Sequence, residues 1–265
     1  MSIFTGRITH LGGTKIFARL DMNEAGEVAQ YLVYSMSVGT DSETAMIIPL
    51  PVSSQSEDAL DFIPLNGYTE FFDHMEKGFP SPLAGLDKGI ASIASDPGSP
   101  RNKLAVQAVG DFIASFVPTL GDFDRLDTRF HLPASTWDKL SQYRDWGYAV
   151  FQLKESAVGK ASAKGFARRI HPMAFQFPTD MDESLYFPTL LVHDGQVNDT
   201  REFDHTLYFQ GEEYHDFADE ITPNNADAFM KIEKAGGIVH PDTVCGRRSI
   251  VGMFANEDTC VSRPE

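Results

Sequence analysis

Three histidines in the third quarter of the chain stand in segments that resemble β-strands, and together they suggest metal chemistry. His171 opens HPMAFQFP, His193 ends LYFPTLLVH, and His205 lies in FDHTLYFQ. Side chains alternate between the two faces of a strand, so each imidazole continues a row of apolar residues. A charged imidazole without a partner is costly to bury. Each ring is therefore expected to be neutral and either hydrogen-bonded or bound to a metal ion.

The segments Leu185–His193 and Phe203–Phe209 are predicted to form a hairpin whose loop is DGQVNDTRE. Such a hairpin would bring His193 close to His205 at its loop end. His171, on an adjacent strand, would complete a three-histidine site with an open fourth position. Catalytic zinc or iron centres use this arrangement to activate water. The cofactor expected at this site is a divalent metal ion such as zinc or iron.

Acidic residues beside these histidines could assist the metal. Asp194 and Asp204 are candidates to orient an imidazole or to bind the ion directly, and Glu202 is a candidate general base on metal-bound water. This hypothesis describes a metal-dependent hydrolase or oxidoreductase acting on a small molecule or peptide. The alternative is a more common role for a histidine at a strand end, a hydrogen-bonded residue without metal. The histidine spacing matches no known metal motif.

A second group of carboxylates offers acid–base chemistry. Asp180, Asp182 and Glu183 are crowded together, and one of them could have a raised pKa. No pattern of sugar-stacking aromatic residues surrounds them, which weakens a glycosidase interpretation.

Several common catalytic motifs are absent from the sequence. It contains no Gly-x-Gly-x-x-Gly, no Gly-x-Ser-x-Gly, no His-Glu-x-x-His and no Cys-x-x-Cys. The sequence around Gly159–Lys160 lacks the first glycine and the Ser or Thr of a phosphate-binding loop. These absences argue against the usual nucleotide-binding and serine-hydrolase classes.

The charge of the chain restricts its partners. Its 265 residues carry 38 acidic and 22 basic side chains, for a formal net charge of −16. Such a surface repels nucleic acid and anionic membranes, because both bind through Lys and Arg. The segment Asp180–Glu220 is strongly acidic, whereas Lys154–Arg169 is basic. The alternative to an enzyme is therefore a non-catalytic binding module that docks a basic protein partner on its acidic surface. A homo-oligomer paired through strand edges is a third hypothesis.

The ends of the chain and its cysteines indicate the compartment. The N-terminal sequence MSIFTGRITHLGG lacks the features of an export signal, and no apolar run approaches the length of a membrane-spanning helix. Cys245 and Cys260 are too few for a disulfide framework. We therefore expect a cytoplasmic protein with two free thiols.

Hydrophobic periodicity predicts an α+β fold, mainly an antiparallel β-sheet or sandwich with a few short helices. Alternating or continuous apolar runs predict strands over Thr14–Leu20, Val28–Val38, Ala45–Val52, Leu104–Val117, Trp146–Leu153, Ile170–Phe177, Leu185–His193, Phe203–Phe209 and Arg248–Phe254. Within Ala45–Val52, Pro49 and Pro51 place the strand at a sheet edge or end it there. Helices are predicted over Asn66–Lys77, Ser135–Tyr143 and Ala226–Ala235.

The domain organisation expected is one compact domain over residues 1–265. The Ser/Pro/Gly-rich segment 95–103 is the best candidate for a subdivision into 1–94 and 104–265.

Overall fold

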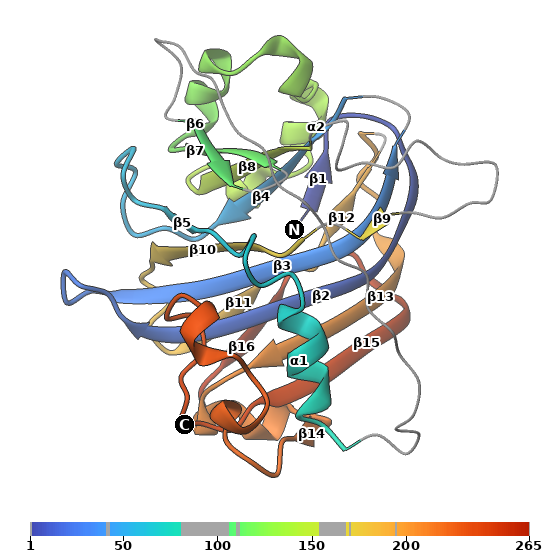
Figure 1. The fold of residues 1–265 in the computed structure, drawn as a ribbon. Coiled ribbons are helices and arrows are strands. Elements are labelled where there is room, and N and C mark those ends of the chain that lie inside the picture. The colour runs from blue at the N-terminus through green and yellow to red at the C-terminus, as the bar shows by residue number, and fades with distance from the viewer. Residues whose placement is uncertain are drawn as a thin grey trace.

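The computed structural model describes residues 2–40, 43–80, 106–109, 112–153, 168–169, 171–193 and 195–264. Two large β-sheets dominate it (Figure 1). The eight-stranded sheet contains, in spatial order, β14 (Glu220–Ile221), β15 (Gly246–Ala255), β13 (Thr200–Phe209), β2 (Ile8–Met22), β3 (Val28–Thr40), β10 (Met173–Pro178) and β5 (Asp61–Ile63), with β9 (Arg168–Arg169) also paired to β3.

The six-stranded sheet lies beside it as a second layer. Its strands are, in order, β12 (Leu191–Val192), β1 (Ser2–Phe4), β4 (Ala45–Leu50), β8 (Gly147–Leu153), β7 (Phe112–Val117) and β6 (Val106–Val109). A two-stranded sheet joins β11 (Ser184–Phe187) to β16 (Thr259–Ser262). The prediction of a β-rich fold is confirmed. Its antiparallel character is only partly right, because β1 pairs with β12, and β13 with β2, in parallel.

The helices are short. The two α-helices are α1 (Phe71–Lys77) and α2 (Ala134–Asp138), and the 3-10 helices are η1 (Leu120–Arg125), η2 (Thr128–Phe130), η3 (Ser141–Tyr143), η4 (Glu212–Phe217), η5 (Ala226–Ala228) and η6 (Ile232–Lys234). No helix in the described ranges is long and apolar enough to cross a membrane.

Both sheets are apolar on both faces, which creates three layers of core. Between the sheets, Ile16, Leu32 and Phe175 of the larger sheet pack with Phe151 of the smaller one. The helix α1 lies over the other face of the larger sheet (Figure 1). Residues of that face such as Phe17 and Tyr208 pack against it. On the other face of the smaller sheet, Ile47, Tyr148 and Val150 pack against the segment that contains η1 and α2. A strand covered on both faces has no clear polar alternation, because both of its side-chain rows are buried.

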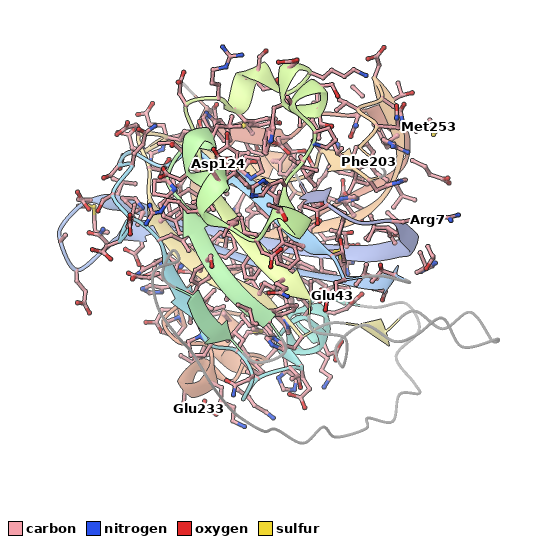
Figure 2. All side chains as sticks on the ribbon, turned by 90° about the horizontal axis from the view of Figure 1, so that it is seen from above. Arg7, Glu43, Asp124, Phe203, Glu233 and Met253 are labelled. Atoms are coloured by element: carbon pink, nitrogen blue, oxygen red, sulfur yellow. The ribbon has the colours of Figure 1, made fainter. Side chains whose placement is uncertain are left out.

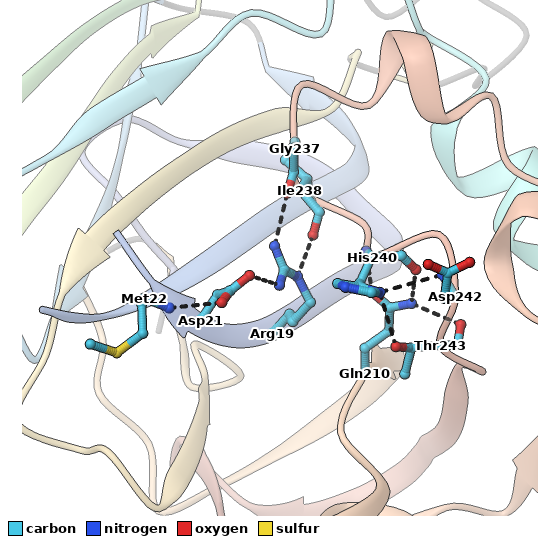
Figure 3. A network of polar contacts seen from close by, with 9 residues as sticks. All are labelled: Arg19, Asp21, Met22, Gln210, Gly237, Ile238, His240, Asp242 and Thr243. Atoms are coloured by element: carbon cyan, nitrogen blue, oxygen red, sulfur yellow. Dashed lines mark hydrogen bonds and ion pairs between the residues drawn. The ribbon is translucent and has the colours of Figure 1, made fainter. Parts of the chain in front are cut away.

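A polar network attaches the loop before β15 to β2 (Figure 3). The buried Arg19 donates from Nε to the carbonyl of Ile238 at 2.8 Å and from a terminal nitrogen to the carbonyl of Gly237 at 2.8 Å. The same guanidinium pairs with Asp21. Beside it, Gln210 donates to the carbonyls of His240 and Thr243 and accepts from the His240 N–H. Arg19 is thus a buried cation whose partners are two backbone carbonyls and one carboxylate.

Several predicted elements differ from the observed ones. The helix expected over Asn66–Lys77 begins only at Phe71, because residues 65–71 form separate turns. The helix expected over Ala226–Ala235 is replaced by η5 and η6. There the N–H groups of Ala226 and Asp227 bond to the carbonyls of Thr243 and Pro241.

The proline-containing strand lies inside the six-stranded sheet. β4 pairs with β8 as far as Leu50, but with β1 only at Met46 and Ile47. At Pro49 the strand therefore has a partner on one side only, where a residue without an N–H is tolerated.

The segment expected as one strand over Leu104–Val117 contains the paired strands β6 and β7. The strand expected over Leu185–His193 is divided between β11 and β12. The proposed division at 95–103 falls outside the described residues, as does most of the basic segment 154–169. Each large sheet combines strands from before and after residue 95.

Candidate functional site

The candidate site begins where β2 separates from β13. The two strands pair from His205 with Thr14 to Phe209 with Ala18, and the pairing stops at Thr14. At this point β2 has a register shift between Gly12 and Lys15, and Gly13 has a φ of 60°. The N–H of Gly13 donates to Oδ2 of Asp204 at 2.8 Å. A carboxylate of β13 therefore bonds the backbone where the strand-to-strand ladder has ended.

A cavity of about 270 Å³ lies at this separation. Its wall comes from β2, β13, β12 and the residue that follows β12. The lining residues are Leu11, Gly12, Thr14, Leu191, His193, Arg201, Glu202, Asp204 and His205. Four of the six side chains expected at the metal site therefore line one cavity.

His205 is the most unusual group in this cavity. Its exposed fraction is 1%, and neither ring nitrogen has a hydrogen-bond partner among the described residues. Burial lowers the pKa of His205 from 6.5 to about 4. The imidazole is therefore neutral at pH 7, with one N–H and one lone pair. The Phe203 ring lies 5.0 Å away, centroid to centroid.

His171 lies elsewhere. Its ring packs against Phe112 of the six-stranded sheet, with centroids 4.6 Å apart, and its Nδ1 lies 2.9 Å from the carbonyl oxygen of Pro172. It precedes β10, and β2 and β3 stand between β10 and β13 in the sheet. The cavity thus holds two of the three expected histidines.

The expected hairpin does not form either. β12 joins β1, and β13 lies between β15 and β2. His193 and His205 instead reach the same cavity from the two different sheets. Asp194 falls outside the described residues.

Metal binding at this cavity stays a prediction, as does the role of Glu202 as a general base. Within the described ranges, no three His, Cys, Asp or Glu side chains are grouped so that they could hold a metal ion.

The two acidic residues of the cavity lack compensating charges. Neither Glu202 nor Asp204 forms an ion pair among the described side chains. Both residues are exposed on β13. The nearby Arg201 directs a terminal nitrogen to the carbonyl of Gln196 at 3.4 Å. The cavity therefore offers mainly hydrogen-bond acceptors.

The other sequence candidates do not contribute to a cavity that we can describe. Asp180, Asp182 and Glu183 are exposed in the turn between β10 and β11. None of them lines the cavity at β13 or a second cavity of about 280 Å³ between the turn after β2 and the segment before β5. Cys245 and Cys260 are free thiols, the first buried and the second exposed.

A surface that the sequence did not single out lies next to the cavity, on β15. Val251 and Met253 are each 66% exposed, and Phe254 is 48% exposed. Met253 lies at the rim of the molecule (Figure 2). Large apolar side chains gathered on one exposed strand often mark an interaction site. Val251 and Met253 share one face of the strand, whereas Phe254 lies on the other face, with its ring centroid 6.4 Å from that of Phe203. We call Val251 and Met253 the β15 patch.

The strand that carries the β15 patch has one unpaired edge. On the side away from β13, β14 pairs only with Gly246 and Arg247, and the Asp219 carboxylate accepts from the Ser249 N–H. Beyond Ser249, no other described strand pairs with this edge. Backbone groups alternate in direction along a strand, so the N–H and C=O groups of Val251 and Met253 point outward.

The β15 patch adjoins the uncompensated carboxylates. Met253 is the cross-strand neighbour of Glu202, and Val251 is that of Asp204. An apolar row and an acidic row therefore run side by side on one face of the sheet. Farther along β15, Arg247 and Arg248 are neutralised by Glu220 and Asp219.

Comparisons with known proteins give little further information. No family model matches the chain, and no curated protein matches it. A solved structure that it resembles is the crystal structure of baculovirus P35, with a TM-score of 0.46 and 10% identity over 99% of this chain and 100% of that one. A likeness of this degree carries no argument about function.

Proposed function

We propose that the chain is a non-catalytic binding protein that pairs the free edge of β15 with an extended, basic segment of a partner protein. The observation that carries this proposal is the unpaired edge of β15 beside exposed apolar side chains and two uncompensated carboxylates. Addition of a strand to a sheet edge obtains affinity from main-chain hydrogen bonds and specificity from alternate side chains.

The side chains near this edge suit a partner strand that carries both apolar and basic residues on one face. Apolar residues of the added strand would pack on Val251 and Met253, which are mostly exposed without a partner. Long basic side chains on the same face would reach across β15 toward Glu202 and Asp204. The net charge of −16 would attract such a segment and repel an acidic one.

A second copy of this chain fits the same edge less well. Two copies would bring together surfaces of the same net charge, and Glu202 and Asp204 would have no cation to pair with. A basic partner removes both objections, so we favour it over a homo-oligomer.

A peptide titration tests the proposal. We expect a short peptide that carries valine and lysine in turn at every second position, with serine between them, to bind, measured by fluorescence anisotropy, and the matching glutamate–valine peptide not to bind. Met253→Lys should weaken binding by about tenfold, since it replaces an apolar contact with a like charge. Met22→Lys is the matched control, because Met22 is 56% exposed at the far end of β2.

The backbone part of the proposal has its own readout. Binding should slow amide hydrogen exchange at Val251 and Met253, and a peptide N-methylated at alternate residues should lose affinity. Equal binding of both peptides, or equal effects of Met253→Lys and Met22→Lys, would overturn the proposal. A concentration-dependent dimer at pH 7.5 in low salt that is abolished by Met253→Lys would assign the edge to a second copy instead.

A further inference from the structure

An exposed turn before α1 carries Asn66 and Gly67, the one Asn-Gly pair of the sequence. The Tyr68 N–H donates to the carbonyl of Leu65 at 3.0 Å, so Asn66 and Gly67 are the two central residues of a β-turn. Both are exposed, whereas Leu65 and Tyr68 are buried. We infer that Asn66 is a site of spontaneous modification, which deamidates through the backbone nitrogen of Gly67 and forms isoaspartate. The inference does not depend on the proposed function.

The reaction needs only these two residues and water. The Gly67 nitrogen forms a bond to Cγ of Asn66, and the bond from Cγ to Nδ2 breaks. The proton of the Gly67 N–H passes through solvent to the leaving nitrogen, which departs as ammonia. Water then opens the resulting five-membered imide at either of its carbonyls. One product is aspartate, and the other is isoaspartate, in which the main chain runs through the former side chain.

The turn leaves the reacting groups available. Within the described part of the chain, the Gly67 N–H has no acceptor and the Asn66 side chain has no hydrogen-bond partner. No heavy atom lies within 4 Å of the position that a Cβ of Gly67 would occupy. The missing Cβ also allows the backbone rotation that ring closure requires. This rotation breaks the bond between Tyr68 and Leu65, and the loss of one neutral hydrogen bond slows the reaction by about tenfold at most.

Two other asparagines lack this combination. The Asn256 side chain accepts from the Leu191 N–H and donates to the carbonyls of Leu191 and Asn198. The Asn23 side chain accepts from two backbone N–H groups of its own turn. Asn23 and Asn256 are each followed by glutamate, whose side chain hinders the approach of the backbone nitrogen. Modification should therefore be faster at Asn66 than at either of them.

The modified turn would disturb a buried anchor. Isoaspartate adds one methylene to the main chain between Leu65 and Tyr68, whose side chains lie in the core cluster that includes α1. The Tyr68 hydroxyl accepts from the Lys231 N–H at 2.9 Å and lies 2.9 Å from Nδ1 of His74. Tyr68 therefore joins α1 to the segment before η6. A longer main chain at the turn should displace the Tyr68 hydroxyl and expose the Lys231 N–H to hydrogen exchange.

Incubation of the full chain at pH 8, followed by peptide mass spectrometry, tests the inference. The peptide that contains Asn66 should gain the mass of replacing NH2 by OH and become a substrate for protein-isoaspartate methyltransferase. Its rate should lie within about tenfold of that of a synthetic peptide of residues 62–72. In the modified protein, separated by ion exchange through its additional negative charge, the Lys231 N–H should exchange faster.

Two variants serve as controls. Gly67→Ala should slow the modification several-fold without loss of stability, because the added methyl group has open space around it but hinders the attack. Asn66→Asp carries the additional charge without the additional methylene, so it should leave exchange at Lys231 unchanged.

Three results would overturn the assignment of Asn66. They are no isoaspartate at this position when the synthetic peptide has been converted, equal rates for Gly67→Ala and the wild type, and equal conversion at Asn256. Unchanged exchange at Lys231 in the modified protein would overturn the link from the turn to Tyr68.

Discussion

At the scale of single residues, a buried polar group without a partner makes stability depend on pH. Burial lowers the pKa of His205 to about 4 in the folded chain, whereas the ring has its ordinary pKa of 6.5 when the chain is unfolded. Between these values the unfolded state binds a proton that the folded state excludes. The free energy of unfolding should therefore fall as pH drops from 6.5 to 4, by about 3 kcal/mol from this residue.

The variant His205→Leu removes this contribution. Urea denaturation of the two proteins from pH 7.5 to 4 should show that the variant is at least as stable at pH 7 and loses less stability toward pH 4. The comparison cancels the contributions of all other groups, which both proteins share. Parallel stability curves for the two proteins would contradict the neutral, unpartnered state of His205.

Arg19 is a buried cation whose three guanidinium nitrogens each have a hydrogen-bond acceptor, so its removal should destabilise the fold. Arg19 bonds two carbonyls and one carboxylate, and its guanidinium lies 4.6 Å from the ring centroid of Tyr31. We expect Arg19→Ala to lower the free energy of unfolding by about 3 kcal/mol, since it removes a buried guanidinium and leaves the carbonyl of the buried Ile238 without its donor. Arg125→Ala is the control, because its ion pair with Glu57 is largely exposed and should contribute little to stability. Equal losses in urea denaturation would show that the Arg19 bonds contribute little.

The Arg19 pair also affects acid stability. Burial would raise the pKa of Asp21, but hydrogen bonds from Arg19 and from the Met22 N–H outweigh it, and the pKa is lowered overall. The carboxylate therefore stabilises the fold above its unfolded pKa, and this contribution is lost as pH falls through the lower, folded pKa.

At the scale of elements, one strand pair depends on a missing side chain. Gly246 of β15 is opposite Phe209 of β13, and a Cβ at Gly246 would lie 2.3 Å from the phenylalanine ring. We expect Gly246→Ala to destabilise the fold by about 2 kcal/mol, because the buried ring has little room to move. Gly67→Ala is the control, since no atom lies within 4 Å of its Cβ position. Thermal denaturation should separate the two variants, and similar transition temperatures would contradict the predicted clash.

The elements also show what the sequence could predict. Most of the longer strands were predicted near their observed bounds, because continuous runs such as Val28–Val38 are buried on both faces of a sheet. The short strands β1, β5, β9, β14 and β16 were not predicted. Partner strands were not predictable in this way. Consecutive strands suggested a hairpin for His193 and His205, whereas β13 pairs in parallel with β2, almost two hundred residues earlier.

The candidate site was predicted in part, although the predicted hairpin is not what brings its residues together. His193, Glu202, Asp204 and His205 do line one cavity, but His171 lies against Phe112. The β15 patch was missed because Val251 and Met253 resemble core residues in sequence. Only the spatial order of the strands shows that they lie near an unpaired edge.

At the scale of the whole molecule, net charge and the free edge of β15 oppose one another. A long edge with exposed apolar side chains favours pairing between copies. The charge of −16 opposes it at neutral pH, and this repulsion vanishes near the isoelectric point of about 4.8. Salt should also weaken the repulsion, since charges separated by more than about 10 Å are largely screened at 0.1 M ionic strength.

We therefore expect the protein to remain monomeric at pH 7.5 in low salt and to associate as pH approaches 5 or as salt increases. Light scattering coupled to size-exclusion chromatography would measure this. The double variant Val251→Lys with Met253→Lys should stay monomeric under the same conditions, because lysines on an edge strand block edge-to-edge pairing. Its net charge changes only from −16 to about −14, so general repulsion alone would predict slightly more association, not less. Association of the double variant equal to that of the wild type would place the contact between copies away from β15.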